Sequence, residues 1–204
     1  MRKNAAIIAL TGAGISKSCG IPTFQETPGL SDKLSVNFRA SHPKEFRAAM
    51  DLLTRNCSGK NPTAAHRALA QYQIPIITMN IDGLHQAAGA ELVLELHGSV
   101  AKNNVVLYGQ QVLHVDDAIN LISALGNYAR RNALDGYFLI IGTSMQTQFA
   151  NYLHRIAVQV GLSAKYINED ADALVPKFLG SLDLSKQTAF NATVVSHAEY
   201  GRQD

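Results

Sequence analysis

Cysteine is scarce in this chain of 204 residues, which contains only Cys19 and Cys57. Neither belongs to a Cys-X-X-Cys pair, so the sequence excludes a cysteine-based structural zinc site and a disulfide framework. The seven histidines show no paired ligand spacing, and we therefore predict no bound metal and no zinc. Two isolated thiols are typical of a reducing compartment, so we expect a cytoplasmic location.

Long apolar runs are also missing. No stretch approaches the roughly 20 apolar residues that a membrane span needs, so we expect no contact with a membrane core. Residues 1–3 and the apolar run 5–10 are similar to the front of a signal peptide, but no cleavage-like region follows them. We interpret the apolar run as a buried strand.

Neither sign of charge dominates. Lys and Arg total 18 against 16 for Asp and Glu, and no basic run stands out. The sequence therefore gives no reason to expect a nucleic-acid partner. A hydrophobic content of 47% and a charged content of 17% are ordinary for a soluble globular protein. The length fits one domain, and we expect residues 1–204 to form it, with a small helical insertion at about 22–72.

Strand-like and helix-like segments alternate along the chain. Apolar runs predict strands at residues 5–11, 75–78, 92–96, 105–107, 137–141 and 165–167, with a final strand at 192–196. Helical patterns cover residues 44–55, 63–72, 116–132, 149–160 and 173–179. Prolines, glycines and polar residues predict a long, mobile loop at 26–44. This alternation predicts an α/β fold, a Rossmann-like parallel sheet with helices on both faces.

Polar or glycine-rich segments follow the predicted strands. They are residues 12–14, 80–82, 97–98, 142–144 and 168–169. Ligands of such sheets bind outside the carboxyl ends of the strands, so a binding site is expected there. Gly12 to Gly14 suit backbone amides near a diphosphate, but Lys17 replaces the third glycine of the ordinary dinucleotide fingerprint. A tight turn that needs glycine for conformational reasons explains the pair equally well.

Six short motifs in order resemble the sirtuin family over residues 5–170. They are Gly12-Ala13-Gly14-Ile15-Ser16 with Gly20-Ile21-Pro22 and Phe24, then Thr78-Met79-Asn80-Ile81-Asp82-Gly83-Leu84-His85 with Ala88-Gly89, Glu95-Leu96-His97-Gly98-Ser99, Val105-Val106-Leu107-Tyr108-Gly109, Gly142-Thr143-Ser144 and Ile167-Asn168. The resemblance implies NAD as cofactor, an acylated protein or peptide as partner, and NAD-dependent lysine deacylation.

The resemblance also implies a role for each matching residue. The diphosphate would lie at Gly12, Ala13, Gly14 and Ile15, with Gly142, Thr143 and Ser144 beside it and Asn168 at the adenosine ribose. Asn80 and Asp82 would form the nicotinamide pocket, where an amide needs a donor and an acceptor. Phe24 would cover the reacting sugar, and Val106 and Tyr108 would line the acyl-lysine tunnel.

His97 is the histidine that we predict to be catalytic, together with Asn80 and Asp82. It follows a predicted strand inside a matching motif, and its near-neutral pKa suits a general base. For His66 and His85, packing or hydrogen bonding is the simpler account. His42, His114, His154 and His197 are interpreted as surface residues.

Three departures from the family pattern bear on turnover. Only residues 100–104 join the histidine motif to the tunnel motif, so the family's four-cysteine zinc module is missing. Thr23 and Gln25 replace an Asp and an Arg beside Phe24, which removes a guanidinium. Met79 replaces a glutamine. Three functions therefore remain open: a minimal NAD-dependent deacylase, an NAD glycohydrolase or ADP-ribosyltransferase, and a non-catalytic NAD-binding module.

Overall fold

A computed structural model describes residues 2–200 of the chain, except for the side chains of Phe24 and residues 195–200. The strands are β1 (Lys3–Thr11), β2 (Ile76–Thr78), β3 (Val93–Glu95), β4 (Asp135–Ile141), β5 (Ser163–Ile167) and β6 (Leu182–Asp183). The α-helices are α1 (Leu30–Lys33), α2 (Val36–Ser41), α3 (Pro43–Cys57), α4 (Ala64–Gln71), α5 (Leu84–Ala87), α6 (Val115–Arg131), α7 (Gln148–Gln159), α8 (Ala171–Gly180) and α9 (Gln187–Tyr200). Two 3-10 helices cover Ala13–Cys19 and Phe24–Glu26.

The strands form one parallel sheet in the order β3-β2-β1-β4-β5, and β6 pairs with the start of β1. Thr11 is opposite both Thr78 and Ile141. Thr78 is in turn opposite Glu95, and Ile141 opposite Ile167. All five main strands therefore end at one level. The predicted Rossmann-like fold is confirmed, and this order places a crevice beyond the end of β1.

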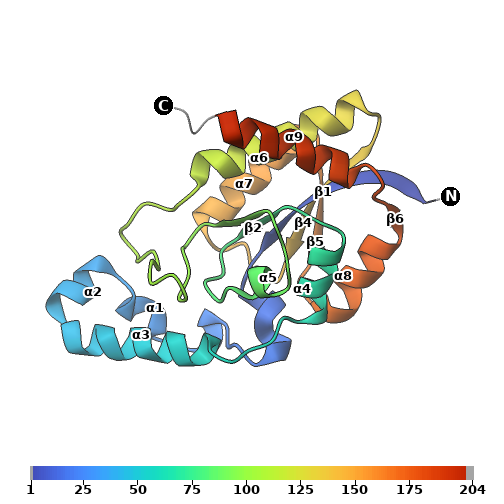
Figure 1. Ribbon diagram of the computed structural model, residues 1–204. Helices are drawn as coiled ribbons and strands as arrows, with labels where there is room; N and C mark the ends of the chain where they lie inside the picture. Colours follow the sequence, from blue (N-terminus) through green and yellow to red (C-terminus); the bar gives the residue numbers. More distant parts are fainter. Residues whose placement is uncertain (1, 201–204) are drawn as a thin grey trace.

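Helices cover both faces of the sheet (Figure 1). On one face, alternate residues of β1 pack with α6, α7 and α9 around the fully buried Phe138 and Phe190. On the other face, the remaining β1 residues pack with α4 and α8. β1 is apolar throughout its centre because both of its faces are covered. Among residues 2–200, no helix is long and apolar enough to cross a membrane.

The predicted mobile loop at residues 26–44 is wrong. Helices α1 and α2 occupy it and, together with α3, form a small lobe beside the sheet (Figure 1). Leu30 and Leu34 are buried against Leu53 of α3 and against Leu107. The Ser35 hydroxyl accepts a hydrogen bond from the Phe38 amide at 3.1 Å and so begins α2. Buried leucines and a capping serine outweigh the many helix breakers in this segment.

Two predicted strands are also wrong. Residues 105–107 pair with no strand, and only a single bridge joins Ser35 to Tyr108. Residues 192–196 lie within α9. That helix packs on α6 through Phe190, whose ring centroid is 5.4 Å from that of Tyr128. Phe190 is fully buried and Val194 packs against the same core cluster, so the contacts of the helix with this sheet face outweigh the β propensity of the segment.

Candidate functional site

A cavity of about 510 Å³ opens at the carboxyl edge of the sheet. It lies where the ends of β1, β2, β4 and β5 converge and where the small lobe meets the sheet. The predicted site residues that line it are Gly12, Ala13, Gly14, Asn80, Asp82, His97, Tyr108, Gly142, Thr143, Ser144 and Asn168. Eleven predicted residues from six separate parts of the sequence thus share one cavity.

Three predicted residues are not placed in this cavity. The Ile15 side chain is 1% exposed and packs in the core beneath α4. Val106 is half-buried, and its amide donates to the His97 carbonyl at 2.9 Å. The side chain of Phe24 lies outside the described residues. The Ile15 side chain is therefore part of the core, and its predicted contact with a cofactor stays a prediction.

The glycines of the first turn are required by their contact with the turn after β4. The Gly14 amide donates to the Gly142 carbonyl at 2.8 Å, and a Cβ on Gly14 would lie 2.6 Å from Gly142 Cα. A Cβ on Gly12 would lie 2.8 Å from Thr143 Cβ. The two turns therefore pack backbone to backbone, and this packing explains the glycines without a ligand. Ala13, which lies between them, lines the cavity.

Asn80 and Asp82 are held by a buried serine that the sequence did not single out. Asn80 Nδ2 lies 3.2 Å from the Gly12 carbonyl oxygen and 3.3 Å from Ser16 Oγ. Ser16 Oγ donates to Asp82 Oδ2 at 2.7 Å. Asp82 Oδ1 accepts from the Leu84 amide at 3.0 Å. None of these contacts uses Asn80 Oδ1, which leaves an acceptor for a ligand. The signal for Ser16 was its place in the first motif.

A buried polar chain supports Asn80 from beneath. The Asn80 amide donates to Thr78 Oγ1 at 3.0 Å, and Thr11 Oγ1 donates to the same oxygen at 2.8 Å. His85 Nε2 lies 2.9 Å from Thr11 Oγ1, and the His85 and His66 rings are 4.6 Å apart. Burial lowers the pKa of His66 to about 4 and lowers that of His85 as well. Both histidines are structural, as predicted.

His97 lines the cavity two residues after β3 and is half-buried. Burial lowers the pKa of its imidazole below the usual 6.5, because the apolar surroundings disfavour the charged form. The ring is therefore neutral at pH 7 and can accept a proton. Cys57 also lines the cavity, but burial raises the pKa of its thiol to about 11, so it is not a ready nucleophile.

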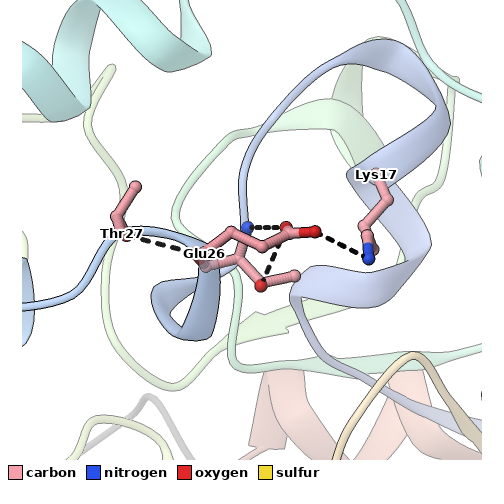
Figure 2. Close-up of polar contacts among 4 residues, drawn as sticks. Lys17, Glu26 and Thr27 are labelled. Atoms are coloured by element: carbon pink, nitrogen blue, oxygen red, sulfur yellow. Dashed lines mark hydrogen bonds and ion pairs between the residues drawn. The ribbon is translucent and has the colours of Figure 1, made fainter.

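Residues 21–27, called the rim segment below, fold over the rim of the cavity and are held there by polar contacts. Lys17 Nζ lies 2.8 Å from Glu26 Oε1, and Thr23 donates to Glu26 Oε2 through its amide and its hydroxyl, both at 2.9 Å (Figure 2). Gln25, which belongs to the same segment, donates through Nε2 to Oε1 of Gln146 on the opposite rim at 3.4 Å. Within the described residues, no group of three or more His, Cys, Asp or Glu could hold a metal ion.

NAD-dependent protein deacetylases and deacylases are among the known proteins to which the chain is similar. The chain is 38% identical over 128 residues to an NAD-dependent protein deacetylase of Saccharolobus solfataricus, an alignment that covers 58% of this chain and 50% of the relative. It is 30% identical over 207 residues to an NAD-dependent protein deacetylase of Chromobacterium violaceum, covering 79% and 81%. The chain thus spans about half the length of the first of these relatives.

Solved structures agree on the fold. A Sir2 homologue mutant in complex with ADP-ribose superposes with a TM-score of 0.74 at 21% identity, covering 88% of this chain and 92% of that one. A Sir2 complex with an inhibitor, acetyl-ADP-ribose and a deacetylated p53 peptide gives a TM-score of 0.67 at 26% identity, covering 86% and 91%. The sequence model of the Sir2 family matches residues 12–120, more than half of the chain. The chain belongs to the Sir2 family, the sirtuins.

Proposed function

We propose that this protein is an NAD-dependent protein lysine deacylase that releases nicotinamide. The observation that carries the proposal is the single cavity that joins the Gly12–Gly14 turn, the Asn80–Asp82 pair and His97 in a chain of this family. Its relatives are named NAD-dependent protein deacetylases or deacylases. A volume of about 510 Å³ lies in the usual range for a cofactor pocket.

The cavity residues fit the parts of NAD. The turns at Ala13 and Ser144 would hold the diphosphate, and Asn168 would bind the adenosine ribose. Asn80 Oδ1 is an acceptor free for the nicotinamide amide, and Asp82 is oriented beside it by Ser16. The Phe24 side chain would cover the reacting sugar. NAD would supply the reacting sugar carbon. The bond from this carbon to nicotinamide would break, and a bond to the acyl oxygen of the substrate would form.

His97 and the tunnel residues would act on the acyl side. His97, neutral because it is buried, would accept the proton of a ribose hydroxyl. Tyr108, 60% exposed at the cavity mouth, and Val106, bonded to the His97 backbone, would flank the acyl-lysine chain.

Transfer of ADP-ribose to water is the second candidate. The hydrogen bonds of the Leu107 backbone favour this candidate. In a deacylase, an extended substrate peptide would pair with the backbone at Leu107 as an added strand. The Leu107 amide donates to Gln110 Oε1 at 2.7 Å, and the Leu107 carbonyl accepts from the Gln110 amide at 2.9 Å. Both polar groups of Leu107 are therefore already paired within the chain, which leaves less for an extended peptide to bind.

One experiment separates the two candidates. The purified protein is incubated with NAD, with and without an acetyl-lysine peptide, and the released nicotinamide is measured. Release that depends on the peptide supports deacylation, and release at an equal rate without it supports hydrolysis. NAD affinity without any release would leave only the binding module, and a lack of affinity would refute the cofactor itself.

Three further expectations complete the proposal. We propose that residues 1–204 act as one NAD-binding unit and that the protein is cytoplasmic, on the grounds of its composition and two thiols. We also propose that it binds no zinc. Stoichiometric zinc in an elemental analysis of the purified protein would contradict the last of these.

A further inference from the structure

The cavity is poor in positive charge. Among its described lining residues, Lys17 is the only lysine or arginine, whereas Glu26 and Asp82 are both acidic. His97 is neutral at pH 7 because burial lowers its pKa. A diphosphate would add two negative charges to a cavity whose described lining is already negative, and Lys17 is the one lining cation that could offset them beside the backbone amides of the turns.

Lys17 is paired with Glu26, and the Glu26 carboxylate also accepts hydrogen bonds from Thr23. Glu26 Oε1 faces Lys17 Nζ at 2.8 Å, while Glu26 Oε2 accepts both hydrogen bonds from Thr23. Figure 2 shows Glu26 between the Lys17 side chain and the segment that carries Thr27. Since the two oxygens serve different partners, Lys17 can leave without breaking the bonds that shape the Thr23–Glu26 turn.

The ion pair is also easy to open. The side chains of Lys17 and Glu26 are 55% and 46% exposed. An exposed pair of this kind contributes little to stability, because water and salt screen it and two flexible side chains must be ordered. A diphosphate carries two negative charges in all, whereas the Glu26 carboxylate carries one, so the total Coulomb attraction of the diphosphate for the ammonium is larger.

We propose that Lys17 is a cofactor-binding residue that contacts the diphosphate of NAD, and that Glu26 pairs with Lys17 when no cofactor is bound and competes with the cofactor for it. The proposal rests on the proposed binding of NAD. Gln25, the neighbouring residue of the rim segment, is uncharged and is bonded to Gln146, so it cannot take this role. The positive charge that binds the diphosphate therefore comes from Lys17, in the 3-10 helix Ala13–Cys19, and not from the rim segment.

The two members of the pair are predicted to have opposite effects on affinity. Lys17→Gln removes the cation and should weaken the binding of NAD and of ADP-ribose by about 5- to 20-fold, the range for a charge-assisted hydrogen bond at a half-exposed site. Glu26→Gln keeps an acceptor for Thr23 but frees Lys17, and should tighten both ligands by about 2- to 5-fold. In the Lys17→Gln background, Glu26→Gln should have a smaller effect than in the parent, because only the direct repulsion between Glu26 and the diphosphate is then removed.

Calorimetric titration of the full chain with NAD and with ADP-ribose tests this. Lys60→Gln is the matched control, because Lys60 lies in a neighbouring surface hollow with Cys19 and not in the cavity. Thermal midpoints of all variants confirm that they fold. Affinities of Lys17→Gln within two-fold of Lys60→Gln, or a Glu26→Gln protein that binds more weakly than the parent, would overturn the role of Lys17 while leaving NAD binding intact. A parent that binds neither ligand overturns the proposed function and this inference together.

Discussion

At the scale of single residues, His97 distinguishes chemistry from folding. A general base acts mainly in the transition state, so His97→Ala should lower nicotinamide release by about 10²- to 10⁴-fold and change NAD affinity little. A merely structural histidine would behave differently, and its loss would lower the thermal midpoint while the folded fraction kept its turnover. Both quantities should be measured on the same preparation. A destabilised but fully active His97→Ala protein would end the catalytic assignment.

The pH dependence of turnover follows from the burial of His97. Because burial lowers its folded-state pKa below 6.5, the basic form predominates at every pH above that value. We expect kcat to change less between pH 7 and 8 than with an unshifted histidine and to fall in more acidic solution, as the ring becomes protonated. A rate that still rises between pH 7 and 8 would show that another group is the base. His42→Gln, a change at an exposed residue, should leave the profile unaltered.

Gly14 is needed for the packing of two turns against each other more than for a contact with a ligand. Gly14→Ala would place a methyl group 2.6 Å from Gly142 Cα, so the two turns must move apart. We expect a loss of about 1–3 kcal/mol in the free energy of unfolding, as for overpacking in a core. In Gly180→Ala, the added Cβ meets only Tyr72 Oη at 3.6 Å within a helix, and stability should be unchanged or slightly raised. Chemical denaturation of both variants compares them.

At the scale of elements, helix α9 completes the central strand. One side of β1 pairs with β6 at Lys3 and with β2 from Ala9 onward, which leaves a gap in the ladder between them. The buried Gln187 fills it: the Ile7 amide donates to Gln187 Oε1 at 2.8 Å, and Gln187 Nε2 donates to the Ile7 carbonyl at 3.2 Å. One side-chain amide thus stands in for a neighbouring strand.

Removing that amide should be costly. Gln187→Met keeps the approximate size of the side chain but leaves the amide and carbonyl of Ile7 buried without these partners. We expect unfolding to become easier by about 2–5 kcal/mol, the sum for two unsatisfied polar groups. Lys186→Met, one residue earlier in the chain, should have little effect. A Gln187→Met protein as stable as the parent would mean that water or another side chain replaces the amide.

At the scale of the whole molecule, the buried histidine pair couples stability to pH. Burial lowers the pKa of His66 to about 4, although Asp82 and Asp172 partly oppose the shift. The unfolded chain binds a proton below 6.5, whereas the folded chain does so only near 4. The contribution of His66 to stability is therefore complete above pH 6.5 and is lost as the pH falls toward 4.

Acid should destabilise the protein before its carboxylates titrate. Between pH 7 and pH 5, His66 alone should lower the free energy of unfolding by about 2 kcal/mol. Urea denaturation at both pH values measures this difference. His66→Gln should show a smaller loss between the two pH values, whatever its stability at pH 7, whereas His42→Gln should lose as much as the parent. Equal losses in all three proteins would contradict the assignment.

The sequence by itself determined the architecture and the position of the site. The short apolar stretch of β1, which ends in glycine, predicts a strand buried on both faces, and alternation with amphipathic helices such as α6 favours a parallel sheet. The polar segments at the strand ends then share one edge, because parallel strands all point the same way. For this reason Asn80, His97 and Ser144 could be expected in one cavity before any coordinates.

Only the tertiary structure decided features that depend on a distant partner. Residues 105–107 are apolar enough for a strand, but no strand lies beside them, and α9 is a helix because it covers a sheet face. Gly14 is a glycine because a backbone 128 residues away touches it. Lys17 faces Glu26 because the rim segment folds back over the first turn. Local pattern fixes how a segment prefers to fold, whereas contacts between remote segments fix what each side chain meets.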